Sequence, residues 1–104
     1  MKQYTTATKY QLQLKEEIIE AAKMGCTSPE YFDIEVSYER IFLYSGALCF
    51  VLRSKAKENT GMLYMCERSY MVEIGRRGAV KTARINYDNN DVKLRSNKNY
   101  IFTF

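Results

Sequence analysis

Residues 32–39 read FDIEVSYE, and apolar and polar side chains alternate at every step of this segment. Successive side chains of a strand point to opposite faces, so the alternation predicts a β-strand with one buried face. The apolar side carries Phe32, Ile34, Val36 and Tyr38, and the polar side carries Asp33, Glu35, Ser37 and Glu39. No other segment of the chain predicts a strand as clearly.

Two apolar segments follow, residues 41–44 and 47–52, and Ser45-Gly46 separates them. Two strands joined by a two-residue turn explain this arrangement, because glycine suits the backbone of a tight hairpin. The alternative is one buried helix over residues 39–57. The internal glycine and the bulky β-forming residues favour the hairpin. The helical alternative is kept because Ile41, Tyr44, Leu48 and Leu52 also have the spacing of one helical stripe.

Before the first strand, residues 7–24 show the spacing of an amphipathic helix. Thr6 or Thr8 can cap its start, and Gly25 can supply the left-handed residue that commonly ends a helix. The apolar stripe contains Tyr10, Leu14, Ile18, Ala21 and Ala22, and the polar stripe contains Gln13, Glu16, Glu17, Glu20 and Lys23.

The second half of the chain has short alternating segments separated by residues that favour turns. Strands are predicted around residues 62–66 and 70–74, which could also form one bent strand, and around residues 80–87, 92–95 and 100–104. The sequence therefore predicts an α+β fold, with the N-terminal helix packed on an antiparallel sheet of about five or six strands. A chain of 104 residues is expected to form one domain, spanning residues 1–104.

The composition excludes several classes of chemistry. Histidine is absent, so no Ser-His or Cys-His nucleophile and no histidine-ligated metal can form. The three cysteines, Cys26, Cys49 and Cys66, fit neither a disulfide framework nor a zinc ribbon, and Cys49 lies in an apolar run where burial is expected. Reduced thiols and the lack of a long apolar run predict a cytoplasmic protein that is neither exported nor membrane-spanning, with no cofactor and no metal.

Charge is distributed unevenly along the chain. Residues 1–52 carry five Lys and Arg against seven Asp and Glu, whereas residues 53–104 carry eleven against five. This asymmetry points to a polyanionic or acidic partner, although scattered charges also serve any solvated surface. The candidate basic contacts are Arg76, Arg77, Lys81, Arg84, Lys93 and Arg95, and the candidate acidic contact face, expected on one side of a strand, is Asp33, Glu35 and Glu39.

The segment IGRRGAVK at residues 74–81 combines glycine spacing with positive charge. A hairpin turn with two arginines at an exposed tip is the simplest interpretation. The G-x-x-G pattern of residues 75–78 also resembles the loop of a KH domain, which lies between two helices and clamps a nucleic-acid backbone. Alternation before this segment predicts a strand rather than a helix, and Lys81 and Arg84 lie where the KH pattern places apolar residues.

The absence of a catalytic set predicts a small non-catalytic binding protein that contacts a host protein or nucleoprotein stoichiometrically. In composition the chain resembles accessory proteins of phages and mobile elements, including anti-CRISPR inhibitors. The alternative is direct binding of DNA or RNA through residues 75–78 and the C-terminal Lys and Arg residues. Self-association through residues 100–104 would give a homodimer, although pairing of this segment inside the sheet is favoured.

Overall fold

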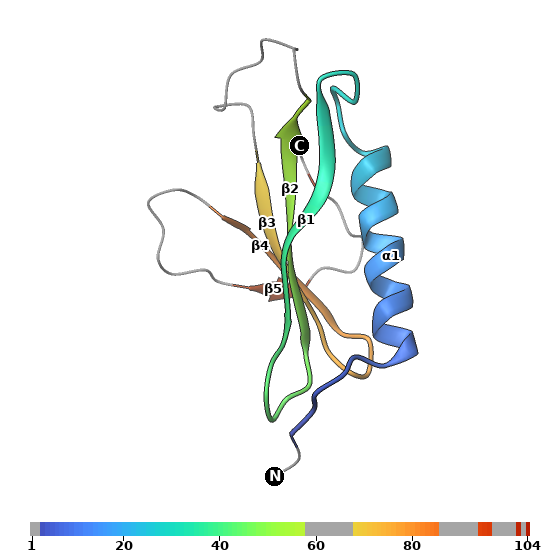
Figure 1. The fold of residues 1–104 in the computed structure, drawn as a ribbon, viewed down its shortest axis with the longest axis vertical. Coiled ribbons are helices and arrows are strands. Elements are labelled where there is room, and N and C mark those ends of the chain that lie inside the picture. Colours follow the sequence, from blue (N-terminus) through green and yellow to red (C-terminus); the bar gives the residue numbers. More distant parts are fainter. Residues whose placement is uncertain (1–2, 58–67, 86–93, 97–101, 103) are drawn as a thin grey trace.

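One helix lies along one face of a twisted antiparallel sheet (Figure 1). The structure is a computed structural model that describes residues 3–57, 68–85, 94–96, 102 and 104. The five strands follow the order β1-β2-β3-β4-β5, so every neighbour in the sheet is also the next strand in the chain. The α+β fold predicted from the sequence is confirmed. The elements are α1 (Lys9–Met24), β1 (Phe32–Ile41), β2 (Leu48–Ala56), β3 (Ser69–Ile74), β4 (Val80–Ile85) and β5 (Arg95–Ser96).

A capping box starts α1. The backbone N–H of Gln11 donates to Oγ1 of Thr8 at 3.0 Å, and the N–H of Thr8 donates to Oε1 of Gln11 at 2.9 Å, which satisfies two donors at the helix start. The prediction of a left-handed residue at Gly25 is wrong, because its φ is −84°. The helix instead closes with the N–H of Gly25 donating to the carbonyl of Ala21 at 3.0 Å.

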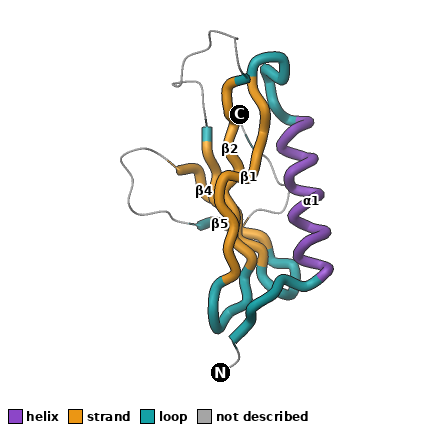
Figure 2. The backbone as a smooth tube through the Cα atoms, in the orientation of Figure 1, coloured by secondary structure: helices purple, strands orange, loops and turns teal. Residues whose placement is uncertain are grey.

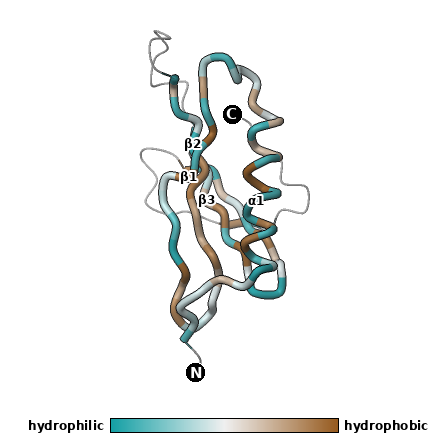
Figure 3. The backbone as a smooth tube through the Cα atoms, turned by 45° about the vertical axis from the view of Figure 1, so that its right-hand side comes forward, coloured by the Kyte–Doolittle hydropathy of each residue, from teal (hydrophilic) through white to brown (hydrophobic). Residues whose placement is uncertain are grey.

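The core lies between α1 and the near face of β1, β2, β3 and β4. The helix buries Gln11, Leu14, Ile18, Ile19 and Ala22 there. The buried face is rotated from the predicted stripe, since Tyr10 is 50% exposed and Gln11 is completely buried. In Figure 3 the hydrophobic stretches of β2 and β3 lie beside hydrophobic turns of α1. The strands contribute Ile34, Leu48, Phe50, Leu52, Val72, Ile74 and Val80 to this core.

A β-bulge interrupts β1 at Ser37. Val36 pairs with Leu52 and Tyr38 pairs with Val51, so Ser37 has no partner in the register. Beyond the bulge, side chains at odd and even positions point to opposite faces from those they occupy before it, because the bulge inserts one extra residue into the strand. The prediction of unbroken alternation over residues 32–39 is therefore wrong after Val36.

The exchange moves Glu39 to the face that α1 covers. Glu39 pairs with the buried Phe50, and its carboxylate forms an ion pair with Nζ of Lys15 on α1. Asp33 and Glu35 precede the bulge and stay on the opposite face. The prediction that Asp33, Glu35 and Glu39 share one strand face is therefore wrong.

The hairpin predicted in the middle of the chain is confirmed, and the alternative of a buried helix over residues 39–57 is wrong (Figure 2). The turn is longer than the predicted two residues, and the strand predicted at 41–44 contributes only Ile41 to β1. The N–H of Phe42 donates to the carbonyl of Ala47 at 3.0 Å, and the N–H of Gly46 donates to the carbonyl of Phe42 at 3.1 Å. Tyr44 and Gly46 both have positive φ, which lets the chain reverse inside this wider loop.

The alternation predicted for residues 70–74 is confirmed in β3, where Val72 and Ile74 are buried. Two of the predicted strands lie wholly or largely outside the described residues, namely 62–66 and 100–104. Phe102 is described, and its buried ring packs edge-to-face against Tyr70 with the ring centroids 5.1 Å apart. This aromatic contact extends the core past the end of α1.

Candidate interaction surface at the hairpin tip

The turn between β1 and β2 and the turn between β3 and β4 lie at the same end of the molecule (Figure 1). Leu48 pairs with Ile74 and Ile74 pairs with Val80, so the turn between β1 and β2 and the turn between β3 and β4 leave the sheet side by side. These turns, residues 42–47 and 75–79, are called the tip below. The N-terminal segment before α1 passes the same end.

Gln11 fixes the tip to the first turn of α1. Its Nε2 donates to the carbonyl of Gly46 at 2.8 Å and to the carbonyl of Ile74 at 3.0 Å. The same side chain accepts from the N–H of Thr8 through Oε1. Hydrogen bonds inside a buried, water-excluded site hold geometry firmly, because breaking one leaves a polar group without a partner. The backbone of both turns is therefore held in one position.

Two glycines allow the tip to close tightly. A Cβ on Gly46 would lie 2.6 Å from Cδ of Arg76 and 2.7 Å from the ring of Tyr4, and a Cβ on Gly78 would lie 2.7 Å from the ring of Tyr10. Both glycines have positive φ, +67° and +92°. Any larger residue would be strained at these positions and would also displace the side chains of Tyr4 and Arg76, or that of Tyr10.

The structure separates the roles of the two arginines in the G-x-x-G segment. Residues 75–78 form the turn between strands β3 and β4, so the hairpin interpretation is confirmed. The guanidinium of Arg76 stacks on the ring of Tyr4, 4.0 Å from its centroid, and Nη1 donates to the carbonyl of Thr6 at 3.2 Å. Arg77 is exposed and takes part in no described hydrogen bond or ion pair. Only Arg77 therefore projects from this turn.

The turn between β1 and β2 presents two large apolar side chains to solvent. Leu43 is 58% exposed and Tyr44 is 55% exposed. Tyr44 also has a φ of +70°, the only positive φ of a non-glycine residue in the described part of the chain. Such a conformation costs on the order of 1 kcal/mol or more and concentrates at functional sites. At Tyr44 it accompanies the reversal of the chain between β1 and β2, and the side chain stays exposed.

A stacked cluster extends the exposed surface from the tip along β1. The guanidinium carbon of Arg40 lies 4.3 Å from the ring centroid of Phe42 and 5.9 Å from that of Tyr38. Arg40 pairs with Cys49, so the cluster occupies the sheet face opposite α1. Stacking on two rings orients the planar guanidinium while its N–H donors stay accessible from the side.

The other predicted basic contacts do not form one stripe. Lys81 pairs with Glu73 and lies on the face opposite α1, whereas Arg84 pairs with Tyr70 and lies on the other face, as the alternation predicted. Arg95 pairs with Thr82 and so shares the face of Arg84. Lys93 lies outside the described residues.

The acidic candidates have basic neighbours. Asp33 pairs with Lys55, and its Oδ1 lies 3.7 Å from Nζ of Lys57. Glu35 pairs with Arg53 across the same two strands. Opposite charges on neighbouring strands stabilise a sheet modestly, so these carboxylates already serve the packing of β1 on β2.

Cys49 is almost completely buried, as its apolar surroundings predicted. Burial raises the pKa of its thiol from 9.0 to about 12, and the charge of Glu73 adds to this effect while that of Arg40 opposes it. A thiol nucleophile must be ionised to react. Cys49 is therefore a structural residue. Among the described residues, no group of three Cys, Asp or Glu side chains is placed to hold a metal ion.

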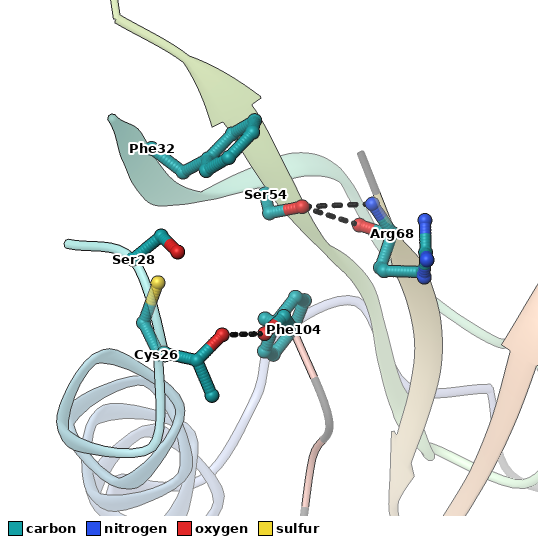
Figure 4. A pocket seen from close by; sticks show the side chains of 7 residues that line it. Cys26, Ser28, Phe32, Ser54, Arg68 and Phe104 are labelled. Carbon is teal, nitrogen blue, oxygen red and sulfur yellow. Dashed lines mark hydrogen bonds between the residues drawn. The ribbon is translucent and has the colours of Figure 1, made fainter. Parts of the chain in front are cut away.

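A pocket of about 210 Å³ lies at the end of the molecule opposite the tip (Figure 4). Its two best-placed hydroxyls bind the backbone of the protein itself: Oγ1 of Thr27 donates to the carbonyl of Phe104 at 2.8 Å, and Oγ of Ser54 accepts from the N–H of Arg68 at 2.7 Å. Because these hydroxyls already bind the backbone, they serve the packing of the C-terminal residues. The tip is therefore the stronger candidate site. The lining residues are Cys26, Thr27, Ser28, Phe32, Ser54, Arg68 and Phe104.

These features define an α+β protein with one helix on a five-stranded antiparallel sheet and an exposed apolar and arginine-bearing tip. No family model, curated protein or solved structure matches the chain. Among the described residues, α1 is the only helix, and it is too short and too polar to cross a membrane.

Proposed function

We propose that the protein is a non-catalytic binding protein that contacts a protein partner stoichiometrically through the tip. The observation that supports this proposal most directly is the presentation of Leu43 and Tyr44, two exposed apolar side chains on a turn whose backbone is fixed. The positive φ of Tyr44 belongs to the reversal of the chain in this turn, and the turn leaves the side chain exposed to a partner.

The composition of the tip fits a protein interface. Tyrosine and arginine are enriched among the residues that dominate binding energy, and a central apolar anchor surrounded by polar groups is their usual setting. Leu43 and Tyr44 provide such an anchor, and Arg40 and Arg77 provide polar groups beside it. A rigid turn also lowers the entropy lost on association, because its backbone is ordered before the partner arrives.

Direct binding of DNA or RNA is the competing function. It would need several cations on one surface to contact successive phosphates. The placement of the basic residues favours a protein partner instead, since Arg76 is held by Tyr4 and Thr6 and the cations of β4 are divided between two faces. The compositional resemblance to phage accessory proteins makes a host protein or nucleoprotein, in the bacterial cytoplasm, the first target to test.

The test compares capture by three forms of the full chain. The tip variant carries Leu43→Ser and Tyr44→Asn, because asparagine tolerates positive φ. The matched control carries Met24→Ser and Tyr31→Asn, which change two exposed large side chains at the other end of α1 and just before β1, away from the tip. A partner from bacterial lysate should co-purify with the wild type and the control but not with the tip variant, and light scattering should show a defined stoichiometry.

Nuclease treatment and moderate salt should leave the captured complex intact. Capture that does not depend on Leu43 and Tyr44 would contradict the proposal. Capture that disappears with nuclease, or that weakens by orders of magnitude as salt is raised, would support the nucleic-acid alternative instead.

A further inference from the structure

We infer that the partner surface recognised by the tip is an acidic protein segment, with carboxylates for Arg40 and Arg77 flanking an apolar site for Leu43 and Tyr44. This inference rests on the proposed function and adds the chemistry of the partner. The argument starts from the charges at this end of the molecule. The described side chains that carry charge in the two turns are Arg76 and Arg77, and both are cationic.

The residues around the tip add to the positive charge. Arg40 lies two residues before the turn on the open face, and Lys9 begins α1, whose first turn contains no acidic residue. Two carboxylates of the described strands lie nearest to the tip. Glu39 binds Lys15 on the face covered by α1, and Glu73 lies on the open face, where the opposite charge of Lys81 on the neighbouring strand offsets it. The surface beside Leu43 and Tyr44 is therefore positive, and a complementary partner is negative.

Carboxylates are acceptors that fit the planar guanidinium groups of the two exposed arginines. The guanidinium of Arg40 lies over the ring of Phe42, which restricts the positions that the side chain samples before binding. A fixed planar fork can form two parallel hydrogen bonds to one carboxylate, and less side-chain entropy is lost when it does so. Arg77 has no described partner and can extend toward a second acidic residue.

The apolar residues distinguish an acidic protein from a nucleic acid. Leu43 lies at the apex of the turn and needs an apolar site, which a sugar-phosphate backbone does not provide. Single-stranded nucleic acids bind through bases stacked on free aromatic rings. The rings of Tyr38 and Phe42 already have Arg40 beside them, which leaves Tyr44 as the one free exposed ring of the two turns, and a single ring does not provide a row of stacking platforms.

The probe for this inference is a random linear peptide library displayed against the immobilised full-length protein. Selected peptides should carry net negative charge together with at least one large apolar residue. Arg40→Glu and Arg77→Glu should each weaken binding of a selected peptide by about tenfold or more, and the double variant should select basic peptides instead. Arg84→Glu is the matched control, because it reverses an exposed charge away from the tip, and it should change affinity less than about twofold.

The outcomes separate this inference from the proposed function. Peptides without charge bias whose binding is lost in the Leu43→Ser, Tyr44→Asn variant would overturn the acidic partner and keep the tip as the docking surface. Peptides that bind the tip variant as well as the wild type would overturn both. Failure to select any peptide that depends on the tip, or oligonucleotide binding that is lost in Arg77→Glu, would also overturn the acidic protein segment as the partner.

Discussion

The side-chain amide of Gln11 donates from Nε2 to the carbonyl of Gly46 at 2.8 Å, although the two residues are separated by 35 positions in the chain. The same nitrogen donates to the carbonyl of Ile74 at 3.0 Å. One buried side chain thus joins the start of α1, the first hairpin turn and the end of β3. The geometry of the tip depends on this junction, and so does any surface that the tip presents.

Replacing Gln11 should therefore destabilise the protein well beyond the loss of its apolar contacts. Gln11→Ala removes the hydrogen bonds to the carbonyls of Gly46 and Ile74 and to the N–H of Thr8 in a buried site, and we expect the free energy of unfolding to fall by about 2–4 kcal/mol. Urea denaturation measures this change. Gln13→Ala on the exposed face of α1 is the control and should change stability by less than about 0.5 kcal/mol. Equal effects of the two variants would show that the junction does not hold the tip.

The glycines of the tip offer a matched pair of substitutions. Gly46→Ala places a Cβ 2.6 Å from Arg76 and forces alanine to a φ of +67°, so we expect a loss of about 2 kcal/mol and a lower Tm. Gly75→Ala meets only ordinary contacts, the nearest at 3.6 Å, and its φ is not positive. Its effect should stay within about 0.5 kcal/mol. A neutral Gly46→Ala would mean that Tyr4 and Arg76 pack less closely on this turn than the structure shows.

Much of this fold can be predicted from local patterns. The alternation of residues 70–74 predicts β3, and the spacing of residues 7–24 predicts α1, because both patterns follow directly from backbone periodicity. The bulge at Ser37 has no such signal. Whether an extra residue is accommodated depends on the pairing of β1 with β2, which is a tertiary property. An unbroken alternation takes no account of this one extra residue and therefore predicts Glu39 on the wrong face of the sheet.

The candidate site was harder to predict than the fold. The charge of Arg77 makes it a candidate contact from the sequence, whereas the apolar run that contains Leu43 and Tyr44 predicts a strand, because such a run gives no sign that it will become an exposed turn. Gln11 did carry a signal, since Thr8 followed by Gln11 has the spacing of a capping box. Its second role, binding two distant carbonyls, depends on which residues the fold brings to the helix.

The ion pair between Lys15 and Glu39 should contribute measurably to the packing of α1 on the sheet. Its side chains are partly shielded from solvent, unlike those of Glu20 and Lys23, which are more than half exposed. In a double-mutant cycle with Lys15→Met and Glu39→Gln, we expect a coupling energy of about 0.5–1 kcal/mol. The same cycle at Glu20 and Lys23 should give a value near zero. Similar couplings for the two pairs would show that shielding by α1 adds nothing.

Cys49 predicts a specific loss of stability at alkaline pH. The folded protein keeps this thiol protonated up to a pKa of about 12, whereas the unfolded chain releases the proton from 9.0 upward. Between these values the unfolded state binds fewer protons, so the free energy of unfolding falls as pH rises, and below 9.0 the effect is absent. Urea denaturation of wild type and Cys49→Ala should show the wild-type value falling faster above pH 9.0. Parallel curves would contradict the burial of the thiol.

Tyr44 should show opposite effects on stability and on binding. Glycine adopts a φ of +70° without strain, so Tyr44→Gly should raise the free energy of unfolding by about 0.5–1 kcal/mol, because the exposed ring contributes little packing. The same change removes an apolar anchor of the tip and should weaken partner binding by tenfold or more, about 1.4 kcal/mol. Thermal unfolding and calorimetric titration with the captured partner measure the two effects. Tyr38→Gly is the contrasting control, since glycine within a strand should lower stability. If Tyr44→Gly is less stable than the wild type, the ring of Tyr44 supports the fold. The positive φ of Tyr44 is then explained without a binding partner.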